Sequence, residues 1–285
     1  MRKIAFFSCA FFLTYVITNA QTGKVYDNLT LNSKILKGER NFSIYLPPDY
    51  ETSMRDYPVL YLLHGAGDNH TGWVQFGEVL YITDKAIKEG KATPMIIVMP
   101  DADTGQRGYF NRVDWRYEDF FFEEFMPYVE KTYRIKSEKR YRAVSGLSMG
   151  GGGAFMYALH KPELFSSACP LSASVGMLPQ DTLRLNDFAR DKEKSVEEIR
   201  TYLNHHSAIS LLDSVPIDKI KSVRWYIDCG DDDFLYEGNS LVHIAMKKKR
   251  IAHEYRVRDG GHTWTYWRAS LPKVLQFVSD AFHQY

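Results

Sequence analysis

The sequence predicts an α/β fold in which a mostly parallel central sheet carries helices on both faces. Apolar runs of strand length alternate with longer amphipathic segments, which favours βαβ units with right-handed crossovers. Several runs are nearly continuous in Val, Ile, Leu and Tyr, as is typical of parallel strands buried on both faces. The 285 residues, 45% of them hydrophobic, suffice for one sizeable core. The predicted strands are 40–47, 58–65, 94–100, 140–146, 166–172, 223–230 and 253–260.

Helical patterns occupy the segments between these strands. Pro127 should kink or shorten the helix predicted over 115–132. Residues 239–250 end in "KKKR", four cations that suit a helix C-terminus. The polar, helix-prone stretch 178–221 predicts a small helical insertion that acts as a lid over one end of the sheet. The apolar stripe of the 115–132 helix is Tyr117, Phe121, Phe125 and Tyr128.

The first twenty residues are typical of a secretory signal peptide. Arg2 and Lys3 precede a short apolar run, and Ala20 provides the small residue at a cleavage site. The alternative, a stable membrane span, is disfavoured because the run is too short to cross a bilayer. We therefore expect a mature single domain over 21–285 that is secreted or periplasmic. Cleavage changes the net charge from +1 to −1, and this balance favours neither nucleic acid nor an anionic membrane as a partner.

Cleavage would leave two cysteines, Cys169 and Cys229, each in an apolar, strand-like run. Buried free thiols are the expected state, and a bridge between them is the alternative in an oxidising compartment. The sequence has no CxxC or HExxH spacing, so we predict no metal site and no other cofactor.

Glycines surround one serine in "GLSMG", residues 146–150, which matches the pattern G-x-S-x-G. A predicted strand, "RYRAVS", precedes it and a helical pattern, "MGGGGAFMYALH", follows it. This is the context of a nucleophile elbow, in which a sharp strand-to-helix turn exposes the serine hydroxyl. The competing interpretation is a glycine-rich contact between helix and strand that contains an incidental serine. The context favours Ser148 as a catalytic nucleophile.

A serine nucleophile needs a base, and the base needs an orienting acid. His262, in "GGHTW", follows the last predicted strand in a glycine-bearing loop, where a base facing Ser148 must lie. "CGDDDFLYEGN" offers Asp231, Asp232 and Asp233 as the acid, and spacing does not choose among them. A calcium site is the rival interpretation, but this run lacks the alternate ligands and the glycine of a calcium loop. Five histidines have less suitable positions: His205, His206, His243, His253 and His283.

Two backbone N–H groups should form an oxyanion hole. One belongs to Met149, directly after the nucleophile, and Ala66 in "HGAGDNHTGW" is the expected second donor. We interpret His64 as structural, a residue that holds this loop in place.

These blocks together resemble the esterase D and feruloyl esterase branch of the α/β-hydrolases. The similar segments are "LLHGAGDNHTGW", "YEDFFFEEFMPYVEKTYRI", "RAVSGLSMGGGGAF", "CGDDDFLYEGN" and "GGHTW", in the family order. The resemblance implies an α/β-hydrolase fold, Ser148 as nucleophile, His262 as base and Asp233 as acid, with Ala66 and Met149 as oxyanion donors. It also implies a serine esterase that removes feruloyl or acetyl groups from xylan. Asp231 and Asp232 depart from the Thr-Glu pair that relatives usually carry before the acid.

Aromatic residues near the expected pocket favour a cinnamoyl or sugar ligand. We expect Trp115 and Trp264 to line the pocket, and Trp73, Trp225 and Trp267 to belong to the core. The charge-rich insertion favours a carbohydrate-linked ester over a triglyceride. The alternatives are a general short-chain esterase of the same fold, and an acyltransferase or a catalytically idle sugar-binding relative.

Overall fold

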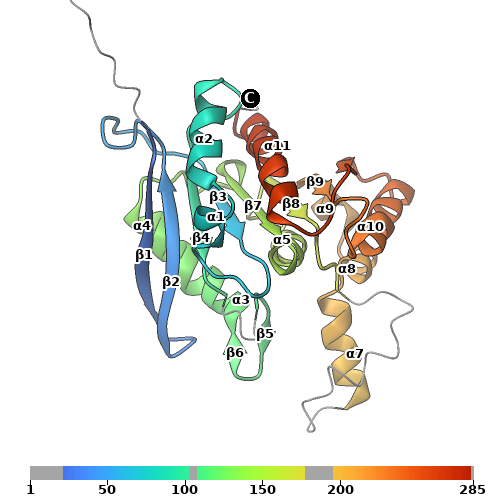
Figure 1. Ribbon diagram of the computed structural model, residues 1–285. Coiled ribbons are helices and arrows are strands. Elements are labelled where there is room, and N and C mark those ends of the chain that lie inside the picture. Colours follow the sequence, from blue (N-terminus) through green and yellow to red (C-terminus); the bar gives the residue numbers. More distant parts are fainter. Residues whose placement is uncertain (1–21, 103–107, 177–194, 284–285) are drawn as a thin grey trace, which may run out of the picture.

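The computed structural model describes residues 22–102, 108–176 and 195–283. Within them an eight-stranded sheet has the order β1-β2-β4-β3-β7-β8-β9-β10 (Figure 1). In this order, neighbouring strands pair in parallel from β4 onward, whereas β2 pairs antiparallel with both β1 and β4. The predicted signal peptide, residues 1–20, lies outside the described residues. The strands are β1 (Lys24–Ser33), β2 (Gly38–Leu46), β3 (Val59–Leu63), β4 (Ile96–Pro100), β7 (Arg142–Leu147), β8 (Ser167–Leu171), β9 (Arg224–Asp228) and β10 (His253–Arg256); β5 (Asn111–Arg112) and β6 (Trp115–Arg116) form a separate hairpin.

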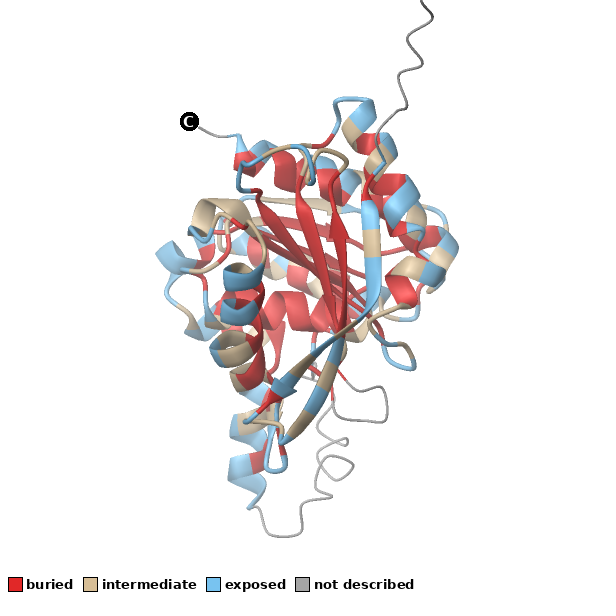
Figure 2. Cartoon of the chain, turned by 90° about the vertical axis from the view of Figure 1, so that its left-hand side faces the viewer, coloured by how far each residue is buried: buried red, intermediate tan, exposed pale blue. Residues whose placement is uncertain are grey.

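Helices cover both faces of the sheet, as the alternation of patterns predicts. The central strands are buried, whereas much of β1 is exposed (Figure 2). That exposure explains why the polar strand β1 carries no apolar run in the sequence. The helices are α1 (Gly72–Gln75), α2 (Val79–Lys88), α3 (Tyr117–Asp119), the π-helix η1 (Phe120–Phe125), α4 (Met126–Thr132), the 3₁₀ turn η2 (Lys139–Tyr141), α5 (Met149–His160), α7 (Val196–His205), α8 (Ala208–Ser214), α9 (Ile217–Lys221), α10 (Tyr236–Lys248) and α11 (Trp264–Phe282).

Two apolar cores lie on the two faces of the sheet. In β3, Leu60 and Leu62 pack against α1, α2 and α11, whereas Val59, Tyr61 and Leu63 pack against η1, α4 and α5. This alternation follows from the two-residue side-chain period of a strand. The carboxyl ends of the parallel strands are thereby held rigidly at one edge, which carries the loops described below.

The predicted helix over 115–132 is the clearest departure from expectation. Trp115 and Arg116 belong to β6, and the π-helix η1 separates α3 from α4. Pro127 is the second residue of α4, so the regular helix does break beside it. The wider π turn shifts the buried face: Phe120 is buried, while Tyr128 is 37% exposed.

Cys169 and Cys229 are both free and buried. Burial raises the pKa of the Cys229 thiol to about 12 and raises that of Cys169 further. Both thiols are therefore protonated, packed side chains, and the expectation of free cysteines is confirmed over the alternative of a bridge.

The described part of the predicted insertion, residues 195–221, is helical as expected. Residues 177–194 lie outside the described residues, so the role of the insertion as a lid stays a prediction. The chain returns at the start of α8 to the segment that follows β8, because Ala208 N–H donates to Val175 O (2.8 Å). Helix α7 projects away from the body at this point (Figure 1).

Three histidine rings join α7 to the end of α5. His205 stacks on His160 with centroids 4.2 Å apart, and His206 meets both rings edge-on. Glu118 accepts a hydrogen bond from His160 (2.7 Å) and raises its pKa. Burial instead lowers the pKa of His206 to about 4. Its Nδ1 donates to Tyr202 O (2.7 Å), while its Nε2 has no hydrogen-bond partner in the described chain.

Acid is therefore expected to weaken this junction. The folded-state pKa of His206 lies below its unfolded value, so its contribution to stability is fully present above about pH 6.5 and is lost as the pH falls toward 4. Over that window the loss amounts to roughly 3 kcal/mol. The free energy of unfolding, measured with urea at several pH values, should depend less on pH in His206→Asn than in the original protein. The asparagine amide keeps a donor near the Nδ1 position. An equal pH dependence of the free energy of unfolding in the two proteins would show that His206 is not its source.

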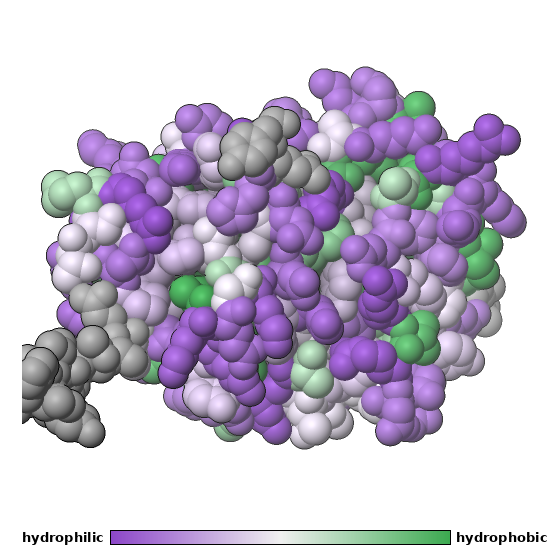
Figure 3. Space-filling view, turned by 90° about the horizontal axis from the view of Figure 1, so that it is seen from above, coloured by the Kyte–Doolittle hydropathy of each residue, from purple (hydrophilic) through white to green (hydrophobic). Residues whose placement is uncertain are grey.

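The helices and the hydropathy of one face of the molecule both matter for contact with a membrane. Among the described residues no helix is both long and apolar enough to cross a bilayer. Seen from above, over α2 and the end of α11, the surface is mainly hydrophilic, with small separate hydrophobic areas (Figure 3).

Candidate active site

Ser148 stands at a sharp turn between β7 and α5. Its φ of 54° and ψ of −115° place a non-glycine residue in a strained region of backbone space. The surrounding backbone holds this conformation, since Ser148 N–H donates to Leu171 O (2.9 Å) and Ser174 N–H donates to Ser148 O (3.0 Å). The turn directs the serine away from both the strand and the helix.

Close backbone packing explains the glycines around Ser148. A Cβ on Gly146 would lie 2.4 Å from the carbonyl oxygen of Gly150. A Cβ on Gly150 would lie 2.5 Å from His64 O, on the neighbouring loop. Any larger side chain would push α5 away from β3 and β7 and relax the turn at Ser148.

The turn brings Ser148 to a histidine 114 residues further along the chain. Ser148 Oγ lies 2.9 Å from His262 Nε2, and His262 Nδ1 lies 2.9 Å from Asp233 Oδ2. The hydroxyl can therefore donate to Nε2 while Nδ1–H donates to the carboxylate. This arrangement allows His262 to take the serine proton and Asp233 to stabilise the resulting imidazolium.

Asp233 is held as an anion in spite of its burial. Its side chain is fully buried, which by itself raises the pKa. Hydrogen bonds from His262, from Leu235 N–H (2.9 Å) and from the Ser172 hydroxyl outweigh that effect and lower the pKa below its usual value. Ser172 also has a positive φ of 43° and accepts a hydrogen bond from Trp267 Nε1 (3.0 Å).

Ser172 was not among the residues predicted from the sequence. It lies directly after β8, and a lone serine at a strand end carries no distinctive signal. Its contact with Asp233 depends on pairing between β8 and β9, which brings distant segments together.

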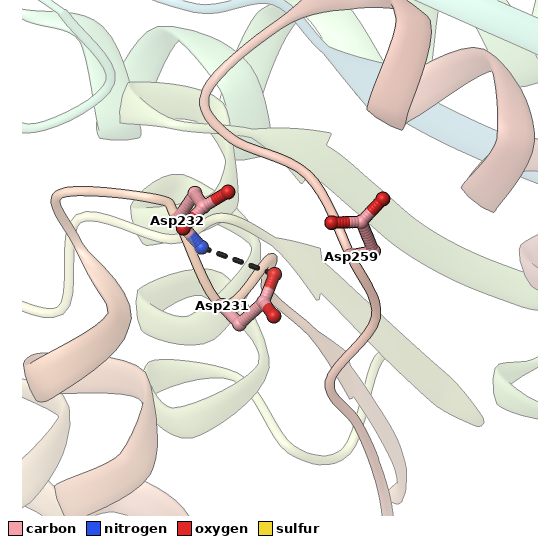
Figure 4. Close-up of side chains that lie close together, drawn as sticks. All are labelled: Asp231, Asp232 and Asp259. Atoms are coloured by element: carbon pink, nitrogen blue, oxygen red, sulfur yellow. Dashed lines mark hydrogen bonds between the residues drawn. The ribbon is translucent and has the colours of Figure 1, made fainter.

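Asp231 and Asp232, the two acids before Asp233, lie on the surface. Asp231 and Asp232 are exposed, and with Asp259 they bring three carboxylates within 4.8 Å of one another (Figure 4). Asp231 Oδ1 accepts hydrogen bonds from Asp232 N–H (3.1 Å) and from Gly260 N–H (3.1 Å). Asp231 therefore ties the acid loop to the loop that carries His262, and of the three consecutive acids Asp233 contacts the histidine.

The loop after β3 approaches the serine from the other side. A Cβ on Gly65 would lie 3.4 Å from Ser148 Cβ, and a turn closed by Asp68 N–H to Gly65 O contains Ala66. Met149 is the first residue of α5, so its N–H has no partner within the helix. Both backbone groups predicted as oxyanion donors thus belong to segments adjacent to Ser148.

His64 holds this loop, as expected for a structural residue. Its Nε2 accepts from Ala102 N–H (3.0 Å), so its other nitrogen carries the proton and donates to Gly65 O (2.8 Å). Tyr109 adds a second constraint, because its hydroxyl accepts from His64 N–H (2.8 Å).

The tryptophans divide differently from the prediction. The assignment of Trp115 to the pocket is corrected: it is 2% exposed, stacks on Tyr117 and donates from Nε1 to Gly108 O (2.8 Å), so it is a core side chain. Trp264 is half-buried and meets Trp73 and Trp267 edge-on at 5.1 and 5.3 Å, and Trp267 in turn contacts His262, so a place for Trp264 in the pocket stays a prediction. The three tryptophans expected in the core are at most 5% exposed: Trp73, Trp225 and Trp267.

Phe234 is an apolar side chain beside the site that the sequence interpretation missed. It is 72% exposed, and its ring centroid lies 4.5 Å from that of His262. An apolar residue in the middle of an acidic loop was the available signal.

The chain is similar to known esterases. The family model described as "Putative esterase" matches residues 33–278. An endo-1,4-beta-xylanase/feruloyl esterase of Xylanibacter ruminicola is 36% identical over 245 residues, which are 82% of this chain and 28% of that protein. An acetyl esterase of Caldicellulosiruptor saccharolyticus is 22% identical and is covered over 95% of its length.

A solved structure points in the same direction. A ferulic acid esterase shares 35% identity and a TM-score of 0.82, with 92% of this chain and 99% of that chain covered. The chain spans about a quarter of the length of the Xylanibacter protein, so the comparison concerns one part of that relative. The chain therefore belongs to this esterase family, in the feruloyl esterase branch of the α/β-hydrolases, and its fold is that of the serine carboxylic-ester hydrolases.

Proposed function

We propose that this protein is a secreted serine esterase that removes feruloyl or acetyl groups from xylan-type polysaccharides through an acyl-enzyme. One observation carries the proposal: Ser148 Oγ, at a strained elbow, lies 2.9 Å from the imidazole of His262, whose other nitrogen meets a buried carboxylate. Export rests on the character of residues 1–20.

The first half of the reaction acylates the serine. As Ser148 Oγ bonds to the ester carbonyl carbon, its proton passes to His262 Nε2, and Asp233 stabilises the imidazolium. The N–H groups of Met149 and Ala66 receive the developing oxyanion. When the tetrahedral intermediate collapses, the ester C–O bond breaks and His262 returns the proton to the departing alcohol oxygen.

The second half restores the enzyme. Water enters beside the acyl-serine and gives a proton to His262 Nε2 as its oxygen bonds to the acyl carbon. Collapse of this second intermediate breaks the bond to Ser148 and returns the proton to Oγ. The products are the free acid and the unchanged serine.

The names of relatives and the surroundings of His262 support the proposed substrate class. The names of two relatives include feruloyl and acetyl esterase activities. The partly accessible ring of Trp264 and the exposed ring of Phe234 are flat apolar surfaces of the kind that accept a sugar or an aromatic acid.

A substrate panel tests the proposal. The purified chain is expected to release ferulate from feruloylated arabinoxylan and methyl ferulate, or acetate from acetylated xylan, with a higher kcat/KM than on 4-nitrophenyl butyrate or tributyrin. Chromatography of the released acids provides the measurement. A preference for tributyrin would favour the general short-chain esterase, and transfer of the acyl group to an added alcohol in place of water would favour an acyltransferase.

A further inference from the structure

Aromatic rings connect one after another beside the imidazole of His262. Phe234 lies 4.5 Å from His262, and Trp267 meets the imidazole edge-on at 4.9 Å. Trp264 lies 5.3 Å from Trp267, and Phe76 lies 6.0 Å from Trp264. Trp267 is buried, so the accessible rings are Phe76, Trp264 and Phe234, which we call the aromatic strip.

The position of the strip decides which half of an ester it can contact. His262 must deliver a proton to the departing alcohol oxygen, so the alcohol has to lie against the accessible part of this imidazole. The acyl carbon lies instead at Ser148, with its oxyanion toward Met149 and Ala66. Phe234, whose ring lies against the imidazole, therefore borders the alcohol half of the ester, and Trp264 and Phe76 lie further out, beyond the buried Trp267.

The exposure of Phe234 is not explained by packing. Its neighbours fix the loop by backbone and carboxylate contacts, since Leu235 N–H donates to Asp233 Oδ1. The Phe234 side chain itself remains 72% exposed, and Phe76 is 50% exposed. Covering such rings with a ligand removes apolar surface from water, which favours binding.

We infer that the aromatic strip binds the sugar that carries the ester, and that Phe234 sets the preference for carbohydrate alcohols over small ones. Pyranose and furanose rings present apolar C–H faces that stack on aromatic side chains. The inference rests on the proposed function and adds to it a specificity-determining residue for the alcohol half of the substrate.

Two ferulate esters that differ only in the alcohol test this inference. With Phe234→Ala, kcat/KM on a feruloylated arabinoxylo-oligosaccharide is expected to fall about three- to tenfold, chiefly through KM, as loss of one aromatic contact implies. On methyl ferulate, kcat/KM should stay within about twofold. Phe234→Trp should restore the value for the oligosaccharide.

Tyr81→Ala is the matched control. Tyr81 is 64% exposed on helix α2, so its removal takes away a similar exposed ring at another place. Both esters should be cleaved by this variant as by the original protein. If Phe234→Ala lowers kcat/KM equally on both esters, Phe234 only positions His262. If it lowers kcat/KM on neither, the ring contacts neither half of the ester. Each result overturns the inference.

A binding measurement separates this inference from the proposed function. Tryptophan fluorescence of the full chain is titrated with the unesterified arabinoxylo-oligosaccharide, which requires no catalysis. We expect saturable binding that Phe234→Ala weakens about three- to tenfold. Absence of ester cleavage with this binding intact would remove the proposed function alone, whereas binding that ignores Phe234, or absence of binding, would overturn the inference.

Discussion

Replacement of Ser148 by alanine is expected to lower kcat on any cleaved ester by about 10⁶-fold, the loss seen when a serine nucleophile is removed. The physical reason is that Oγ forms the bond to the acyl group, and no other side chain at the elbow can replace it. Substrate binding should remain, because the change removes one hydroxyl and leaves the backbone turn. The measurement is the initial rate of ferulate or acetate release by protein free of host esterases.

Ser174→Ala is the matched control for this result. Ser174 is exposed and contacts Ser148 through its backbone N–H, which the substitution retains. Its kcat/KM should stay within about twofold of the original value. Substantial activity in Ser148→Ala, with an unchanged melting temperature, would exclude the acyl-enzyme mechanism.

Replacement of Asp233 by asparagine is expected to lower kcat by about 10⁴-fold, as loss of the acid does in other serine hydrolases. Asp233 is fully buried and accepts hydrogen bonds from His262 Nδ1. An asparagine amide can donate to Nδ1, which moves the imidazole proton to Nε2. Nε2 is then no longer free to accept the proton of Ser148. Steady-state rates on the best ester of the panel provide the measurement.

The neighbouring acids supply the controls. Asp232→Asn changes an exposed carboxylate, and Asp231→Asn keeps a carbonyl oxygen to accept from Gly260 N–H. Each should retain kcat within a few-fold of the original, on the order of 0.5 kcal/mol. Losses equal to that of Asp233→Asn would place the functional acid elsewhere in this loop.

The fold was largely predictable because buried parallel strands leave a direct mark on the sequence. Segments such as "VLYLL" and "IIVM" are apolar throughout, since helices cover both sides of the sheet. The edge strand β1 was missed because most of its residues are exposed or half-buried, so it carries no apolar run. The π-helix at Phe120–Phe125 was missed because the apolar run "FFF" fits a regular helix equally well, and the wider turn shows only in which side chains are buried.

Within the site, predictability depended on how local each constraint is. The elbow is a local feature, since a turn with positive φ and close backbone approach demands glycines within a few residues of Ser148. Trp115 could not be placed from sequence, because the same indole suits a pocket wall and a core. Its stacking on Tyr117 and its hydrogen bond to Gly108 O depend on the β5–β6 hairpin.

The sequence by itself determined the parallel sheet, the elbow at Ser148 and the order of nucleophile, acid loop and histidine. These features follow from side-chain periodicity and backbone sterics, which act over a few residues. Spacing left three consecutive acids open and the family resemblance implied Asp233, whereas the tertiary structure shows the contact of Asp233 with His262 and alone placed Ser172 and Phe234 beside that pair. Burial and orientation of these side chains depend on how β8, β9 and β10 pair, and contacts between distant segments leave no periodic pattern in a single chain.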